Sequence, residues 1–219
     1  MAGEKITHER IIFAFLESSF TKSVGGTSLA DIAGKLGIKK ASLYNHYNSR
    51  DEMLLDTIRY CGEYLKKISF IPSEMDTTAK KYTADTVLKG IVHRWFKMNE
   101  REPLFQIYSF IESEKYFSSN VAEIYKEMRE KLVSQTIIAL NSLVLANKIK
   151  QTTPENLSVL ANIFTGTMCN FLDSYLVEKK KEIRSNPETG AGELFSVPVM
   201  EPDFSQIDKF IEGFCLILV

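Results

Sequence analysis

Hydrophobic residues recur every three or four positions along most of the chain, which is the spacing that places them on one face of an α-helix. The alternation of apolar and polar residues that is typical of β-strands is not sustained in any segment. The pattern therefore predicts an all-α protein of about nine helices. The expected helices begin near residues 6, 28, 39, 51, 78, 103, 121, 154 and 204.

Glycine and proline mark several of the expected helix ends. A pair of glycines follows the first helix, and Pro72 stops the fourth. Thr153 and Pro154 indicate a helix start, with Thr as the N-cap residue and Pro at the first helical position. Residues 185–202 contain three prolines and two glycines, so we expect a loop before the last helix.

Residues 27–50 predict two short helices joined by a tight turn. Ser28 and Asp31 approximate a capping box at the start of the first helix. Ala33 is small where the two helices would cross, and Gly37 suits the left-handed backbone of a sharp turn. Leu43, six positions after Gly37, would be buried between the two helices. This spacing is typical of a helix-turn-helix, although a plain helical hairpin without a DNA-binding role remains an alternative.

The exposed side of the second short helix carries groups that suit DNA. Cations and hydroxyl groups bind phosphates, and amide, imidazole and ammonium groups bind base edges. No acidic residue occurs between Asp31 and Asp51. The side chains of this face are those of Lys39, Lys40, Ser42, Tyr44, Asn45, His46 and Tyr47, with Arg50 just beyond them.

The charge of the chain is divided unevenly. The 219 residues have a formal net charge of −1, so the chain as a whole is no polybasic nucleic-acid binder. Residues 1–50, however, hold seven Lys and Arg residues against four Asp and Glu residues, a net charge of +3, and residues 51–219 carry −4. The segment that is expected to meet DNA is therefore basic, and the remainder is acidic.

Residues 6–58 resemble the N-terminal domain of the TetR family of bacterial transcriptional regulators. The family pattern has a Thr- or Ser-capped helix, an Asp-Ile-Ala run, Gly followed by Val or Ile, a Leu-Tyr-x-His-Tyr/Phe run and a basic residue. Beyond these residues only the length and the helix pattern agree with the family. The matching elements are Thr27-Ser28, Asp31-Ile32-Ala33, Gly37-Ile38, Leu43-Tyr44-Asn45-His46-Tyr47 and Arg50.

The resemblance implies DNA contacts for particular residues of this segment. Tyr44 and His46 match positions that meet the DNA backbone, and Arg50 matches a phosphate-binding residue at the start of the next helix. Tyr47 either contacts a phosphate or packs as the aromatic plug of the domain. Positions that read bases or touch phosphates are occupied by Lys39, Lys40, Ser42 and Asn45.

The start of the first short helix is a further implied contact. Thr27 and Ser28 lie where the free N–H groups and the dipole of the helix would face a phosphate. Ala30 departs from the pattern, because many family members carry a longer polar residue there. This departure puts one of the family's DNA contacts in doubt.

The resemblance divides the chain into a helix-turn-helix domain at residues 1–50 and an effector-binding and dimerisation domain at residues 51–219. The last two helices resemble the four-helix bundle through which family members form homodimers. The apolar stripes of these helices cover either the interior of one chain or a partner chain. The candidate dimer residues are Phe171, Tyr175, Ile207, Phe210, Ile211 and Phe214.

The middle of the chain is rich in aromatic residues, which favours a pocket for a hydrophobic or aromatic effector. These residues either line that pocket or fill the core. His93 beside Arg94 could orient an anionic group, and Glu112 and Glu114 could serve a cationic one, although helix residues of these types are commonly solvated. The candidate effector-binding residues are Trp95, Phe96, Phe105, Tyr108, Tyr125, Phe164 and Met168.

The function that the resemblance implies is that of a ligand-responsive, homodimeric repressor, released from a palindromic DNA operator by a small-molecule effector. A helical small-molecule-binding or interaction protein without DNA binding is the alternative. An enzyme is not expected, because no Ser-His-Asp, HExxH, P-loop or GxGxxG pattern occurs. The three dispersed cysteines predict no disulfide framework or zinc site, and no cofactor is expected. Without a signal peptide or long apolar run, we expect a cytoplasmic protein.

Overall fold

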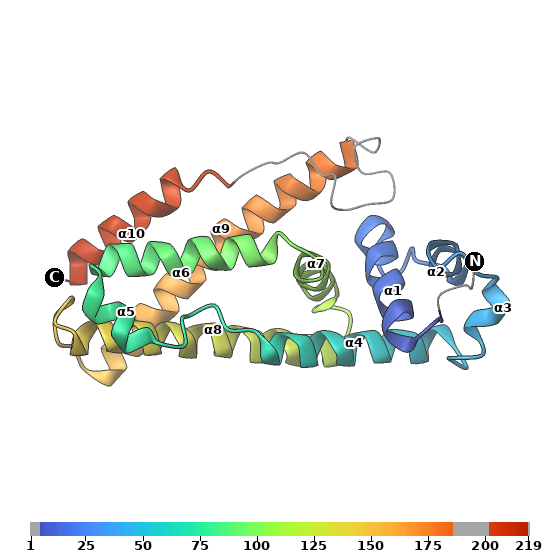
Figure 1. Ribbon diagram of the computed structural model, residues 1–219, viewed down its shortest axis with the longest axis horizontal. Coiled ribbons are helices and arrows are strands. Elements are labelled where there is room, and N and C mark those ends of the chain that lie inside the picture. The colour runs from blue at the N-terminus through green and yellow to red at the C-terminus, as the bar shows by residue number, and fades with distance from the viewer. Residues whose placement is uncertain (1–4, 186–201, 219) are drawn as a thin grey trace. The chain divides into compact units, whose positions relative to one another are not determined.

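The computed structural model describes residues 5–185 and 202–218, and it is helical throughout. Ten helices and no strand occur within these residues, which confirms the all-α prediction (Figure 1). The predicted loop at residues 185–202 lies almost entirely outside the described residues. The helices are α1 (His8–Lys22), α2 (Leu29–Lys35), α3 (Lys40–Leu43), α4 (Arg50–Lys67), α5 (Met75–Lys81), α6 (Ala84–Asn99), α7 (Leu104–Glu114), α8 (Ser119–Leu145), α9 (Pro154–Ser185) and α10 (Ser205–Leu218).

The described residues hold one helix more than expected, because the segment between the predicted helix starts near residues 78 and 103 contains a break. Tyr82 and Thr83 have extended backbone angles between α5 and α6. Thr83 is the N-cap residue of α6, and the acidic Asp85 lies in its first turn, where the helix dipole favours a negative charge. The sequence Thr-Ala-Asp therefore held a helix-start signal that the apolar periodicity alone did not reveal.

Other helix starts are as predicted. The Ser28 hydroxyl accepts a hydrogen bond from the Asp31 N–H at 3.2 Å, and the Asp31 carboxylate accepts one from the Ser28 N–H at 2.9 Å, which completes a capping box. At α9, the Thr153 hydroxyl accepts a hydrogen bond from the Asn156 N–H at 3.2 Å, and Pro154 is the first helical residue. The local sequence signals therefore predicted the starts of both helices correctly.

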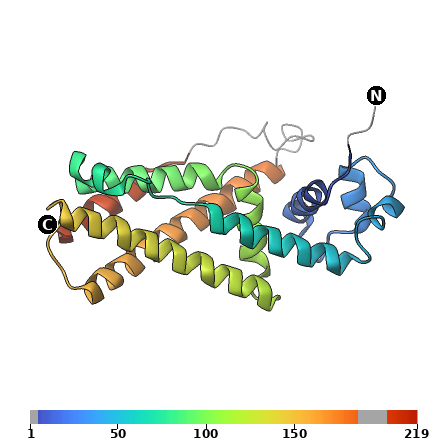
Figure 2. The same ribbon diagram turned by 60° about the horizontal axis from the view of Figure 1, so that its bottom comes forward.

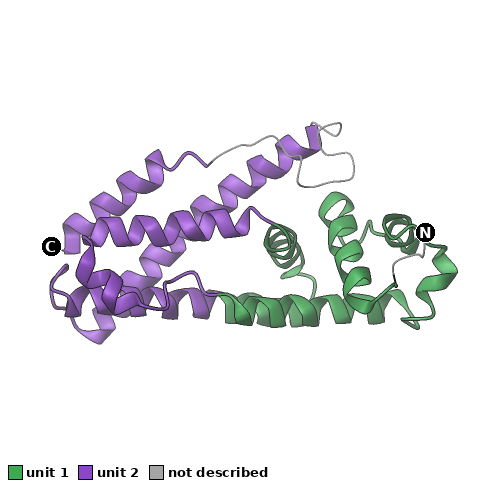
Figure 3. Ribbon diagram, in the orientation of Figure 1, with its two compact units in different colours: residues 1–68, 102–128 green, residues 69–101, 129–219 purple. Residues whose placement is uncertain are grey.

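The chain forms two compact units (Figure 3). The first unit consists of residues 1–68 and 102–128, and contains α1 to α4, α7 and the start of α8. Its core is formed by buried aliphatic and aromatic side chains from each of these helices. The largest of them include Ile11, Phe15, Leu16, Ile32, Leu43, Met53, Ile107 and Ile111.

The second unit consists of residues 69–101 and 129–219, and contains α5, α6, the rest of α8, α9 and α10. Helices α8 and α9 cross, and α10 lies beside α6 (Figures 1 and 2). At the first crossing, the buried hydroxyl groups of Thr136 and Thr165 are 2.9 Å apart. Between α6 and α10, Lys89 pairs with Glu212 and His93 pairs with Asp208, so charged groups flank the apolar contact of these two helices.

The boundary between the units falls at residue 68 and returns at residues 102 and 128. The division of functions at residue 50 stays a prediction, because the compactness of a unit does not reveal which function it carries. Within the described residues, no helix is long and apolar enough to cross a membrane.

Candidate nucleic-acid interface and ligand groove

The turn between α2 and α3 has the geometry that the sequence predicts. Gly37 has a φ angle of +66°, in the left-handed region that favours glycine. The Ile38 N–H donates to the Ala33 carbonyl at 3.0 Å, and the Gly37 N–H donates to the Gly34 carbonyl at 3.2 Å. These two bonds form a Schellman motif, which ends α2 and directs the chain into α3.

Helix α3 is short. Its α-helical part covers Lys40–Leu43, and the N–H groups of the next three residues donate to carbonyls three positions earlier, as in a 3₁₀-helix. The Leu43 side chain is 1% exposed and joins the core formed by α1, α2 and α4. Buried Leu43 therefore anchors the segment, and the residues on either side of it face outward.

The outward side of this segment carries free polar groups. Lys39, Lys40, Tyr44 and Asn45 are exposed, with Tyr44 at 52%. Within the described part of the chain, none of these four side chains makes a hydrogen bond or an ion pair. Ser42 and His46 are half-buried on the same segment, and the His46 ring lies edge-on to His8 at 5.7 Å. Such an arrangement leaves donors and cations available to a polyanion.

The start of α2 is not available in the same way. Thr27 is 2% exposed, and its hydroxyl donates to the Ser23 carbonyl at 2.7 Å. The Ser28 hydroxyl donates to the Asp31 carboxylate at 2.7 Å, and Lys22 pairs with that carboxylate at 2.5 Å. Lys22 and Ser28 hold the pKa of Asp31 well below its usual range, so the carboxylate remains charged. A negative group therefore already occupies the helix start that was predicted to face a phosphate.

Two other predicted contacts have internal roles. Tyr47 is 4% exposed, and its hydroxyl donates to Asp56 at 2.6 Å. Burial and the Asp56 carboxylate raise the pKa of Tyr47. Arg50 donates from Nε to the Thr27 carbonyl at 3.0 Å and from its terminal nitrogen to the Val24 carbonyl, and its guanidinium lies over the Phe15 ring.

Four of the predicted DNA-binding residues have partners within the first unit, and their contacts with DNA stay a prediction. Thr27, Ser28, Tyr47 and Arg50 make hydrogen bonds within the first unit that hold α2, α3 and α4 together. The remaining predicted residues lie on α3 and directly beside it, and we call them the α3 surface. It consists of Lys39, Lys40, Ser42, Tyr44, Asn45 and His46.

The predicted effector-binding residues are divided between the two units. Phe105, Tyr108 and Tyr125 belong to the first unit, where Phe105 packs on Phe20 and the Lys115 ammonium lies 4.1 Å from the centre of the Tyr125 ring. Phe96 is fully buried in the second unit. Its ring lies 5.9 Å from Tyr175 and 5.6 Å from Phe204.

The other three, Trp95, Phe164 and Met168, surround a small space in the second unit. Its volume is about 10 Å³, which is at the lower limit for one water molecule. All three side chains are buried in this structure, and their contact with an effector stays a prediction.

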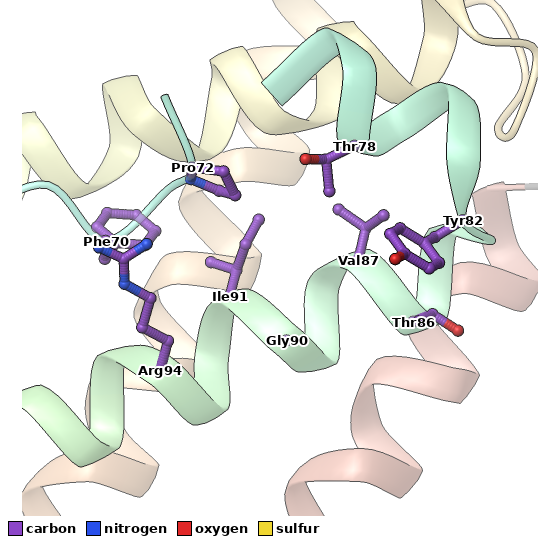
Figure 4. A pocket seen from close by; sticks show the side chains of 9 residues that line it. All are labelled: Phe70, Pro72, Thr78, Tyr82, Thr86, Val87, Gly90, Ile91 and Arg94. Atoms are coloured by element: carbon purple, nitrogen blue, oxygen red, sulfur yellow. The ribbon is translucent and has the colours of Figure 1, made fainter. Parts of the chain in front are cut away.

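A larger open groove lies beside this space, along α6, and we call it the Arg94 groove (Figure 4). Its volume is about 180 Å³. The sequence signal that marks it is Gly90 in the interior of an amphipathic helix, where a larger residue would be a better helix former. Its walls consist of Phe70, Pro72, Thr78, Tyr82, Thr86, Val87, Gly90, Ile91 and Arg94.

The charged residues considered for an effector separate into paired and free groups. The His93 Nε2 atom lies 2.7 Å from Asp208, and the ring stacks on Phe204, so His93 does not act together with Arg94 in the groove. Glu112 pairs with Lys115 at 2.5 Å in the first unit. Arg94 alone of these residues lines the groove.

The predicted dimer residues are mostly covered within one chain. Ile207, Ile211 and Phe214 are buried, and half-buried Phe171 and Phe210 lie with their rings 6.3 Å apart. The Tyr175 hydroxyl donates to Glu100 at 2.6 Å. The exposed apolar side chains of these helices lie at other positions, which are Val159, Ile163 and Val177 on α9 and Leu216 and Ile217 on α10.

Groups that could support catalysis are sparse in the described residues. No cluster of three or more His, Cys, Asp or Glu side chains there could hold a metal ion. The three cysteines are buried and form no disulfide, and burial raises the pKa of the Cys61 thiol to about 12. At neutral pH this thiol remains protonated, the form in which it is a poor nucleophile.

Comparison with known proteins agrees with the helix-turn-helix geometry. Residues 19–57 match the family described as "Bacterial regulatory proteins, tetR family". The chain is 32% identical over 80 residues to the biofilm operon icaADBC HTH-type negative transcriptional regulator IcaR of Staphylococcus aureus, strain Newman. That match covers 36% of this chain and 41% of the regulator, so the chain spans less than half the length of this curated relative.

Solved structures show the same fold over almost the whole chain. A transcriptional regulator from Rhodococcus sp. Rha1 has a TM-score of 0.58 at 14% identity, with 97% of this chain and 98% of that chain covered. The regulator FadR from Bacillus subtilis, in complex with stearoyl-CoA, has a TM-score of 0.51 at 12% identity, with 95% and 97% covered. Together with the capped α2, the Gly37 turn and the buried Leu43, the match over residues 19–57 shows a helix-turn-helix segment similar to that of the tetR family of bacterial regulatory proteins, and the solved structures share the fold of the chain.

Proposed function

We propose that this protein is a dimeric DNA-binding transcriptional repressor of the bacterial cytoplasm that responds to a small-molecule effector. The α3 surface carries this proposal, because it presents two lysines, a tyrosine and an asparagine without partners in the described residues. Cations position a protein on the phosphate backbone, and amide groups distinguish base edges in the major groove.

The relatives support a negative regulator rather than an enzyme. IcaR is by its name a negative transcriptional regulator, and FadR was solved with stearoyl-CoA. The first supports repression by this chain, and the second supports a helical second unit that accepts a ligand.

Effector response would follow from a shift between two conformational populations. Two recognition segments of a dimer must enter successive major grooves about 34–36 Å apart. An effector that binds more tightly to a conformation with another spacing lowers DNA affinity by the ratio of its two affinities. The Arg94 groove is the site at which we place this effector, because it is open and the Trp95 space is not.

Substitution of Lys40 tests the α3 surface. We expect Lys40→Ala to weaken binding to the promoter DNA beside the encoding gene roughly five- to tenfold, because one phosphate contact is lost. The slope of log affinity against log salt concentration should become less negative by about one. Gel mobility shift at several salt concentrations measures both. Lys150→Ala removes an equally exposed lysine of the second unit and should leave both quantities unchanged.

The alternative is a helical interaction protein that does not bind DNA. It predicts that Lys40→Ala and Lys150→Ala have equal effects, or that the unsubstituted protein shows no preference for the promoter over unrelated DNA. Either result would remove the DNA-binding function from this proposal.

The dimer interface that we propose differs from the predicted residues. Val159, Ile163 and Val177 follow one face of α9 at helical spacing and are exposed in the single chain. Exposed apolar side chains that share a face are typical of a subunit interface. Leu216 and Ile217 at the end of α10 extend the apolar surface available to a partner.

A charge on this face should prevent dimerisation. We expect Ile163→Glu to give a monomer by light scattering, because two copies of the carboxylate would be buried near the symmetry axis without partners. The control is Leu145→Glu, which changes an exposed apolar residue at the end of α8. A dimer that survives Ile163→Glu but not Leu145→Glu would place the interface on α8. Removal of α10 is a poorer test, because its buried face would be lost from the core of the same chain.

A further inference from the structure

The Arg94 groove is built from one face of α6 and from the segment that precedes it. Val87, Ile91 and Arg94 lie on this face at helical spacing, and Gly90 lies among them. Phe70 and Pro72, from the linker after α4, lie at the end of the groove near Arg94 (Figure 4). Thr78 and Tyr82 of α5 lie toward the other end. The walls are therefore mainly apolar, with the guanidinium at one end.

Gly90 leaves the centre of the groove open. A Cβ atom added at this position would meet no other atom within 4 Å. The groove volume of about 180 Å³ slightly exceeds that of an engineered apolar cavity of about 150 Å³ that binds benzene. The groove can therefore hold an apolar body about as large as one six-membered ring.

Arg94 is the charge that remains unmatched in the groove. Its side chain makes no hydrogen bond or ion pair within the described residues, whereas Lys89 and His93 of the same helix pair with Glu212 and Asp208. No carboxylate belongs to the residues that line the groove. A guanidinium prefers a planar carboxylate, which it can bind through two parallel hydrogen bonds.

The two threonine hydroxyl groups of the walls are already hydrogen-bonded within the chain. Thr78 donates to the Glu74 carbonyl at 2.9 Å, and the Thr86 hydroxyl pairs with Thr83 at 2.8 Å. A ligand would therefore be oriented mainly by Arg94, with its apolar part along Ile91 and Val87. A long acyl chain or a polyphosphate headgroup exceeds both the volume and the single cation of this groove.

We propose that the Arg94 groove binds a small organic acid, a carboxylate attached to an apolar body of about one ring, with the carboxylate on Arg94. This proposal names the effector class and rests on the effector function proposed above. Binding to the groove can nevertheless be measured without DNA, so the two proposals can fail separately.

Benzoate is the probe for this class, and benzamide is its neutral control of the same shape. By titration calorimetry on the full chain, we expect benzoate to bind once per chain and at least tenfold more tightly than benzamide. Arg94→Gln should remove this preference by weakening benzoate binding at least tenfold and leaving benzamide binding unchanged. Lys97→Gln removes an exposed cation one turn further along α6, outside the groove, and should change neither.

A second variant tests the location independently of charge. Gly90→Leu places a side chain in the open centre of the groove and should abolish binding of both compounds, while circular dichroism confirms an intact helical fold. Equal affinities for benzoate and benzamide, benzoate binding unaffected by Arg94→Gln, or binding that survives Gly90→Leu would each overturn the proposal. So would tighter binding of stearate than of benzoate.

Gel mobility shift with and without benzoate separates the two proposals. If benzoate binds through Arg94 but leaves DNA affinity unchanged, the groove assignment stands and the effector function proposed for it is wrong. If DNA affinity falls in benzoate but equally so in Arg94→Gln, the effector function stands and the groove assignment is wrong.

Discussion

Replacement of Arg50 by Met is expected to destabilise the first unit by about 3 kcal/mol, because hydrogen bonds from a charged donor contribute about 1.5–3 kcal/mol each. Arg50 donates to the carbonyls of Val24 and Thr27, which belong to buried residues between α1 and α2. Methionine keeps much of the side-chain volume but donates nothing. Thermal or urea unfolding monitored by circular dichroism measures the loss.

The same variant decides between two roles for Arg50. The family resemblance implies a phosphate contact, for which Arg50→Met would weaken DNA binding and leave the unfolding midpoint unchanged. The hydrogen bonds to the segment between α1 and α2 imply instead that Arg50→Met lowers the unfolding midpoint before it affects DNA binding. Arg50→Lys keeps the charge but lacks the planar fork that reaches two carbonyls, so we expect it to recover only part of the stability.

Leu43→Ala is the second substitution with a large expected effect. Leu43 is 1% exposed and is the buried residue of α3, so its truncation should cost about 2–5 kcal/mol through lost transfer energy and a cavity. Because α3 has only four α-helical residues, little else holds the α3 surface in place. We therefore expect DNA affinity to fall more than it does in Lys40→Ala.

The control for Leu43→Ala is Ala41→Ser. Ala41 is exposed on the same short helix, so this change should alter stability by less than about 0.5 kcal/mol. Chemical denaturation of both variants, followed by mobility shift under conditions in which both are folded, separates stability from binding. Full DNA affinity in folded Leu43→Ala would show that α3 does not position the contacting side chains.

The helix-turn-helix could be predicted from the sequence because its signals are local. The capping box of α2 joins Ser28 and Asp31, three residues apart, and the turn depends on the backbone of Gly37 itself. The exposed polar face of α3 follows from the burial of Leu43 in a four-residue helix. Each of these features is decided within a few residues, so no knowledge of distant segments is needed.

Which polar residues remain free could not be predicted in this way. Three of the predicted residues have side chains of the kind that bind phosphate, yet each donates to a group within the chain. Thr27 donates to Ser23, and Tyr47 donates to Asp56. Arg50 donates to the carbonyls of Val24 and Thr27. Arg50 reaches carbonyls 23 and 26 positions away along the chain. Partners so distant in sequence are brought together only when the helices pack.

By itself, the sequence determined the helical class, most helix starts and the recognition segment, because these depend on periodicity, caps and a glycine turn. The tertiary structure decided which aromatic residues lie in which unit, where a groove opens and that Arg94, among the described residues that line this groove, is its cation. An apolar stripe specifies that Trp95 or Phe105 is buried but not what covers it. What covers each residue depends on which helices lie side by side. The packing of the helices places Trp95 and Phe105 in different units and leaves Arg94 beside an open groove.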